Sequence, residues 1–195
     1  ILTSNNWKDG NFTIANVPIT DDNYLGGLGK YGAWSLVVIY ENLADSLKSV
    51  SVYDGWEIVY SATGDVDIAV ENFYTPADGN ISASLSVFTA EGDRWITGDH
   101  LLSGTTDLGN PTDNAFNSEI ISSGVRVPEL INNQGIDIKT YDLGTSGFNL
   151  LSHSQNNITF TFTSSGDKYF PSMLSFATEV YSPRMCYYES LYTSS

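Results

Sequence analysis

Two segments of the sequence alternate strictly between apolar and polar residues, and this period of two constrains the fold more than any other feature. In NISASLSVF (80–88) the apolar residues alternate with serine, and in ITFTFT (158–163) isoleucine and phenylalanine alternate with threonine. Successive side chains of a β-strand point to opposite faces of the sheet. Each segment therefore predicts a strand with one buried face and one solvated face.

Strand signals dominate the rest of the chain as well. We expect further strands in 49–60, 65–74 and 173–181, which are rich in β-branched and aromatic residues and are separated by Gly, Asp and Pro. YGAWSLVVIY (31–40) is a continuous apolar run, typical of a strand that is buried on both faces. Helical periodicity is almost absent, and its one short candidate, NLADSLKS (42–49), is compatible with a turn.

Two packed antiparallel sheets bury many such strands without helices. The sequence therefore predicts an all-β protein, an antiparallel and jelly-roll-like β-sandwich with one long polar loop. A chain of 195 residues is long enough to bury the core of one such domain. We place this single domain at residues 1–184 and a Tyr-rich tail or linker at residues 185–195.

The charge of the chain excludes several classes of partner. Eight basic residues against 23 acidic ones give a formal net charge of -15, which repels nucleic acid and anionic lipid. No apolar run approaches the roughly 20 residues that span a bilayer. Acidic chains rich in Asn, Thr and Ser are common outside cells, where calcium is abundant. The single cysteine, Cys186, allows no internal disulfide.

A long polar segment, TGDHLLSGTTDLGNPTDNAFNS (97–118), follows the predicted strand that ends near EGD (91–93). It is too rich in Gly and Asn for a strand or a helix, and long for a loop without internal structure. Its oxygen-bearing side chains are of the kind that calcium prefers, although turns require the same residue types. The predicted calcium ligands are Glu91, Asp93, Asp99, Asp113 and Asn117. The alternative is a structural corner, in which Arg94 and backbone amides satisfy the carboxylates.

Catalytic patterns are weak in this chain. GLGKYG (27–32) matches the dinucleotide-binding pattern, but a strand follows it where a helix is required. His100 and His153 lie in polar segments, and no nucleophile elbow is present. A pair of glycosidase carboxylates needs no short motif, but nothing in the sequence selects one. We therefore expect a protein that is not an enzyme, with no catalytic residues.

Aromatic residues suggest two further contact surfaces. Trp95 lies in the acidic segment and is the tryptophan expected to be exposed, where it could stack on a sugar ring. Trp34 and Trp56 lie in apolar segments and are expected in the core. The end of the chain is dense in tyrosine, which favours contact with another subunit. The tyrosines concerned are Tyr187, Tyr188 and Tyr192.

Several segments also carry a resemblance. These are YGAWSLVVIYENLADSLKSVSVYDGW (31–56), EGDRWITGD (91–99), NPTDNAFNSEI (110–120) and GDKYFPSMLSFATEVYSP (166–183), in that order. Together they resemble an uncharacterised β-rich domain of large secreted and cell-surface, adhesin-like bacterial envelope proteins. The resemblance covers roughly residues 13–190 and assigns no catalytic residue.

The resemblance implies an extracellular or cell-surface location in bacteria, a β-rich module and a role in surface adhesion or structure. We therefore expect a non-enzymatic structural or adhesive module of a bacterial surface or filament-forming protein. The expected partners are other copies of the chain or neighbouring domains of the same protein. The alternative is a calcium-dependent, lectin-like module that binds carbohydrate, with the 91–119 region holding the ion and Trp95 contacting the glycan.

Overall fold

The computed structural model describes residues 13–17, 31–121, 128 and 130–180, and the chain separates into two compact units, residues 1–39 and 40–195. Within the first unit, the described residues 13–17 and 31–39 contain no regular secondary structure. All strands of the described residues belong to the second unit, and these residues contain no helix. Accordingly, no described element is a helix of the length and apolar character needed to span a membrane.

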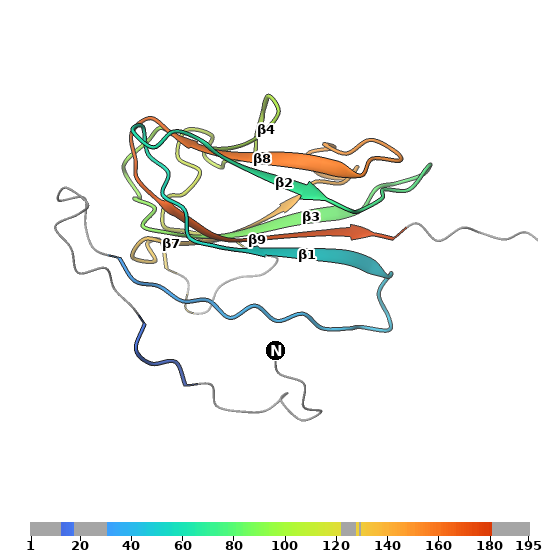
Figure 1. The fold of residues 1–195 in the computed structure, drawn as a ribbon, viewed down its shortest axis with the longest axis horizontal. Helices are drawn as coiled ribbons and strands as arrows, with labels where there is room; N and C mark the ends of the chain where they lie inside the picture. The colour runs from blue at the N-terminus through green and yellow to red at the C-terminus, as the bar shows by residue number, and fades with distance from the viewer. Residues whose placement is uncertain (1–12, 18–30, 122–127, 129, 181–195) are drawn as a thin grey trace, which may run out of the picture. The chain divides into compact units, whose positions relative to one another are not determined.

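The described residues form nine strands in two sheets, which Figure 1 shows as two layers. The five-stranded sheet has the order β1-β9-β3-β7-β6 and the four-stranded sheet the order β2-β8-β4-β5. The first sheet contains β1 (Lys48–Asp54), β3 (Ala83–Ala90), β6 (Ile120–Ile121), β7 (Ile136–Asp142) and β9 (Phe170–Glu179). The second contains β2 (Val66–Glu71), β4 (Asp99–Ser103), β5 (Thr106–Asp107) and β8 (Asn157–Ser164).

The strand order is that of a jelly roll. The first strand, β1, pairs with the last, β9, and the second, β2, pairs with the last but one, β8. All pairs are antiparallel except β6 with β7, which is parallel and lies at the edge of the five-stranded sheet. The predicted all-β, jelly-roll-like sandwich is therefore confirmed.

The core lies between the two sheets and is filled by the inward faces of the alternating strands. Leu85 and Val87 on β3, and Phe160 and Phe162 on β8, are fully buried. The serines and threonines between them point to the other faces, as the period of two requires. The segments NISASLSVF and ITFTFT thus form the strands and present the faces that the sequence predicts.

The prediction of a buried strand at 31–40 is wrong. This segment forms no strand, and Trp34 and Tyr40 are 58% and 76% exposed. The second unit completes both layers with strands from residues 48–179, each offering one face to the core. Strands in these layers have one face toward the core and one outer face, and a run that is apolar on both faces does not fit such a position.

Trp56 is likewise outside the core, at 44% exposure, with its ring stacked 5.1 Å from that of Phe170. The segment 42–49 forms a turn that leads into β1, not a helix. Residues 97–118 are not a structureless loop either, because β4 and β5 form a hairpin within them. The proposed boundary between a domain at 1–184 and a tail at 185–195 stays a prediction, since residues 181–195 lie outside the described residues.

Candidate functional site

Three polar side chains meet in the interior of the sandwich. Lys139 and Asp137 come from β7, and Asn117 comes from the segment between β5 and β6. Their exposed fractions are 2%, 0% and 6%. The Lys139 Nζ lies 2.7 Å from the Asn117 Oδ1 and 3.7 Å from the Asp137 Oδ1. Together with Asp99 on β4, which is also fully buried, these residues are called the Lys139 site.

The pairing of β7 with β3 explains why two charged residues face the core. Lys139 lies opposite Val87 and Asp137 opposite Thr89, and both partners are fully buried. The segment IDIKTYD therefore points Asp, Lys and Tyr inward and leaves its isoleucines half-exposed on the outer face. This reverses the usual rule that the apolar face of a strand is the buried one.

Two carboxylates hold the backbone on either side of Asn117. The Asp137 carboxylate accepts hydrogen bonds from the amides of Ser118, at 3.0 Å, and Glu119, at 2.8 Å. On the other side, the Phe116 amide donates to the Asp99 Oδ2 at 2.6 Å. The Asn117 side chain is thus aimed at Lys139 by a backbone that is fixed both before and after it.

An aromatic cluster covers the segment next to Asn117. The Phe116 ring centroid lies 4.6 Å from that of Tyr169 and 5.8 Å from that of Phe162. All three rings are fully buried. Water is therefore excluded from this part of the core, and electrostatic interactions there are stronger than at the surface.

Gly92 packs directly against the Lys139 site. A Cβ on this residue would lie 2.3 Å from the Asp137 Oδ2 and 2.4 Å from the Phe116 carbonyl oxygen. Glu91 before it has a φ of 70°, a left-handed conformation that turns the chain at this point. The EGD segment thus forms a corner whose central position accepts only glycine.

Burial shifts the ionisation of the site toward neutral species. Loss of solvation raises the pKa of Asp137 to about 7 and that of Asp99 to about 6, although backbone hydrogen bonds and Lys139 act in the opposite direction. The same loss of solvation lowers the pKa of Lys139, against the pull of Asp137. The Asp99 Oδ1 is buried without a hydrogen-bond partner. Burial thus acts against the charged form of both the Lys139 amine and the Asp137 carboxyl.

A third buried carboxyl, that of Asp167, lies close by. Asp167 accepts hydrogen bonds from the amides of Asp93, at 2.9 Å, and Lys168, at 2.7 Å. Desolvation raises the pKa of Asp167 to about 7, and the negative charge of Asp99 adds to this rise. Glu91 also has a pKa raised by desolvation to about 7, and its Oε2 is buried without a hydrogen-bond partner.

The structure distributes the five predicted calcium ligands over three places. Asp99 and Asn117 belong to the Lys139 site, and Glu91 and Asp93 lie beside Asp167. Asp113 has a side chain that is 69% exposed, with its Oδ1 3.7 Å from the His100 Nε2. Within residues 13–17, 31–121, 128 and 130–180, no three His, Cys, Asp or Glu side chains are grouped to hold a metal ion. Calcium binding stays a prediction.

The alternative of a structural corner is visible in part. A backbone amide does donate to one oxygen of Asp99, as that alternative expects, whereas the other oxygen has no partner. Arg94, however, bonds elsewhere: its Nη1 donates to Glu119, at 3.3 Å, and to the carbonyl of Ile131. Its guanidinium also lies 5.2 Å from the centroid of Trp95, which is 83% exposed. The predicted exposure of Trp95 is confirmed, whereas its role in binding a ligand stays a prediction.

The two described histidines have polar partners. The His100 Nδ1 lies 2.7 Å from the Asp107 Oδ2, and the His153 Nε2 lies 2.8 Å from the carbonyl oxygen of Gly79. The hydrogen bond to Asp107 is the main cause of a raised pKa of His100. The assembly residues Tyr187, Tyr188 and Tyr192 lie outside the described residues, as do Trp7 and Cys186.

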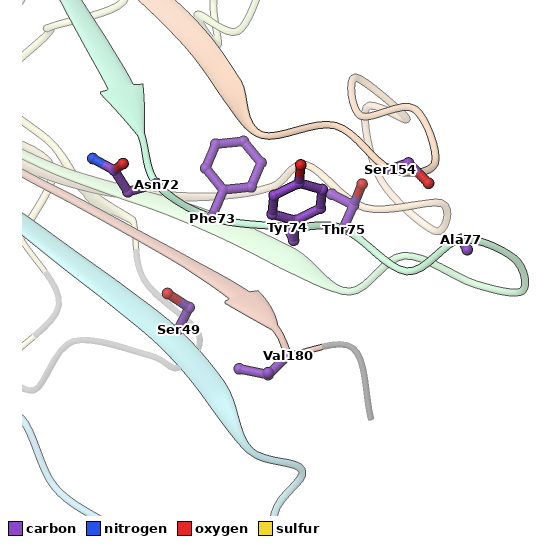
Figure 2. A pocket seen from close by; sticks show the side chains of 8 residues that line it. All are labelled: Ser49, Asn72, Phe73, Tyr74, Thr75, Ala77, Ser154 and Val180. Carbon is purple, nitrogen blue, oxygen red and sulfur yellow. The ribbon is translucent and has the colours of Figure 1, made fainter. Parts of the chain in front are cut away.

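A pocket of about 540 Å³ is lined by none of the residues of these clusters. Figure 2 shows the side chains that line it. It is formed by the segment that follows β2, together with Ser49 of β1 and Val180 beyond β9. The described residues that line it carry apolar, hydroxyl and amide groups, a chemistry suited to contact and not to proton transfer. The lining residues are Ser49, Asn72, Phe73, Tyr74, Thr75, Ala77, Ser154 and Val180.

Sequence reasoning missed Lys139, Asp137 and Gly92. The available signal was IDIKTYD, a strand-like alternation whose polar members could have been read as the inward ones. Comparison with known proteins adds nothing to this picture, because no protein-family model and no curated protein matches the sequence.

Replacement of Gly92 by alanine should destabilise the protein. The new methyl group would force apart the Asp137 carboxylate and the Phe116 backbone, and such overpacking lowers the free energy of unfolding by about 1–3 kcal/mol or more. Gly55→Ala is the matched control, because a Cβ there meets no atom within 4 Å. Denaturant unfolding of the two variants and the wild type measures the difference. Equal stability of both variants would contradict the described corner.

Stability should fall as pH rises from about 5 to about 7.5. The desolvated carboxyls of Glu91, Asp99, Asp137 and Asp167 have folded-state pKa values near 6 to 7, above their ordinary values of 3.8 to 4.5. In this pH range the native state therefore binds more protons than the unfolded state. Asp167→Asn should reduce the slope of the free energy of unfolding against pH by up to about 1.4 kcal/mol per pH unit, because the asparagine cannot bind the proton.

Asp78→Asn is the control for that measurement, because it removes one charge from an exposed position. Its unfolding free energy, measured by denaturant titration at each pH, should run parallel to that of the wild type. If Asp167→Asn also runs parallel, Asp167 does not hold a proton in the native state.

Proposed function

We propose that this chain is a non-enzymatic structural or adhesive module of a bacterial surface or filament-forming protein, which acts outside the cell by packing against copies of itself. The observation that carries the proposal is the composition of β1, an edge strand of the five-stranded sheet. In the described part of the chain, β1 has one strand neighbour, β9. Its Val50 and Val52 side chains are 46% and 38% exposed.

The edge of the other sheet provides a contrast. There, β2 carries Asp67 and Glu71 on its exposed face, and charges of this kind discourage pairing with another chain. The exposed face of β1 carries the two valines between Lys48 and Asp54 at its ends. An edge strand of this composition favours addition of a further strand.

A second exposed segment supports the same function. Residues 36–40, LVVIY, are 42% to 76% exposed and rich in β-branched residues. A run with this composition gains free energy when it leaves water, at about 25 cal/mol per Å² of apolar area. Apolar surface of this extent is typical of contact sites with other proteins.

Self-association should weaken when a charge is placed on either surface. Val52→Lys and Val38→Lys should each raise the dissociation constant about tenfold or more, since a lysine buried at the contact must lose its hydration. Ala69→Lys, on the exposed face of β2, is the control with the same added charge. Sedimentation velocity over a range of concentrations measures the association. A wild-type chain that remains monomeric throughout would contradict the proposal.

A lectin-like function is the second candidate, favoured by the exposure of Trp95 beside the Arg94 guanidinium. A flat aromatic ring of this kind offers a face for a sugar. Binding to a glycan array should then depend on calcium and be lost in Trp95→Ala but not in Tyr74→Ala, which changes an aromatic residue that is 63% exposed elsewhere. An array without signal in calcium, together with a melting temperature unchanged by a chelator, would exclude this candidate.

A further inference from the structure

We propose that the protein forms an amide bond within its own chain, between the Lys139 Nζ and the Asn117 Cγ, with release of ammonia. Asp137 is assigned as the residue that moves the proton. The bond would join two residues that lie 22 positions apart in the sequence. This inference is independent of the proposed function, because it rests only on the Lys139 site.

The two reacting groups are already in contact. The Lys139 Nζ lies 2.7 Å from the Asn117 Oδ1. Since that oxygen is bonded to Cγ, the Nζ lies at most about 1.2 Å further from the carbon that it would attack. Groups held at such distances in a fixed orientation react as an intramolecular pair, with effective concentrations far above those in solution.

Burial shifts Lys139 toward the form that the reaction needs. An ammonium group has no free electron pair, whereas a neutral amine is a nucleophile. Lys139 is 2% exposed, and this burial lowers its pKa. Asp137, whose Oδ1 lies 3.7 Å from the Nζ, is placed to accept a proton from the amine. Its two oxygens are bound by the amides of Ser118 and Glu119, so the same carboxyl also fixes the segment that carries Asn117.

The reaction balances without an oxidant or cofactor. The Nζ electron pair forms a bond to Cγ, and Asp137 takes a proton from the nitrogen. The bond from Cγ to Nδ2 then breaks, and Asp137 returns the proton to Nδ2, which leaves as ammonia. One C–N bond is formed and one is broken. Asp99, buried with one unpartnered oxygen, is the second carboxyl of the site.

The product relieves an electrostatic cost of burying Lys139 beside Asp137. A buried lysine and a buried aspartate each lose hydration that their mutual attraction offsets only in part. Converting the amine to an amide removes one of the two buried ionisable groups permanently. The amide nitrogen keeps one hydrogen, which Asp137 can accept in a hydrogen bond. A hydrogen-bonded lysine that never reacts would leave the full cost in place.

Intact-mass spectrometry of the denatured wild-type chain tests the proposal directly. The measured mass should be lower than the sequence mass by one molecule of ammonia in nearly all of the protein. After trypsin digestion, residues 95–126 and 127–168 should appear as one branched peptide, uncut at Lys139. A wild-type chain with its full sequence mass, or cleaved at Lys139, would overturn the proposal without the need for any variant.

Variants identify the atoms involved. Lys139→Met and Asp137→Asn should have their full sequence mass, whereas Asn117→Asp should form the same branched peptide with loss of water. Lys48→Met removes an exposed lysine and should keep the loss of ammonia. Loss of ammonia that persists in Lys139→Met would instead mean cyclisation of an asparagine, and would overturn the crosslink. Loss that persists in Asp137→Asn would overturn the role of Asp137.

Discussion

The burial of Lys139 beside Asp137 is the interaction on which the rest of the interior depends. Two groups that are ionised in water occupy a region from which two sheets and an aromatic cluster exclude water. Groups of this kind are retained in a core only where every neighbour is fixed around them. Here the neighbours are the amides of Ser118 and Glu119, the Asn117 carbonyl and the backbone of Gly92. These contacts attach the long connection between β5 and β7 to the core of the sandwich.

A covalent amide between Lys139 and Asn117 would supply a crosslink to a chain whose composition provides no disulfide. The chain has one cysteine, so no disulfide within these residues can hold β7 to the segment that precedes it. A bond between lysine and asparagine supplies the same restriction of the unfolded chain, which is the main source of stability from a crosslink. Unlike a disulfide, it does not respond to thiols. A module of this kind would keep its internal link in both oxidising and reducing surroundings.

The sequence predicted those parts of the fold in which the buried face is apolar. In β3 and β8 the serines and threonines mark the outer face, so both the strand and its orientation could be derived. In β7 the same alternation was present with the polar residues inward, and no rule of periodicity distinguishes the two orientations. The prediction for residues 31–40 is wrong for the opposite reason. The apolar content of this segment indicated a buried strand, whereas its large apolar side chains are exposed in the described structure.

Only part of the Lys139 site could be predicted from the sequence. The sequence marks EGD, TGD and NAFN as parts of one polar region with candidate metal ligands, and the structure places Gly92, Asp99 and Asn117 around one centre. That centre includes an amine from β7, which lies 22 residues beyond Asn117 in the chain. A contact of this range depends on the pairing of β7 with β3 and with β6, and a single sequence contains no information on that pairing.

The jelly-roll order also determines how the second unit would respond to tension. The start of β1 lies beside the end of β9, with Lys48 opposite Glu179. A force applied through these two positions would open the hydrogen bonds of the β1–β9 ladder one after another, which resists less than sliding two strands along their length. The link between residues 117 and 139 would not prevent this opening, because it joins β7 to the segment before β6 and involves neither β1 nor β9. It would instead shorten the chain that can be drawn out, by about 3.4 Å for each of the residues it encloses. In the second unit, the β1–β9 pair would then open under a small force, whereas the chain between residues 117 and 139 would not extend.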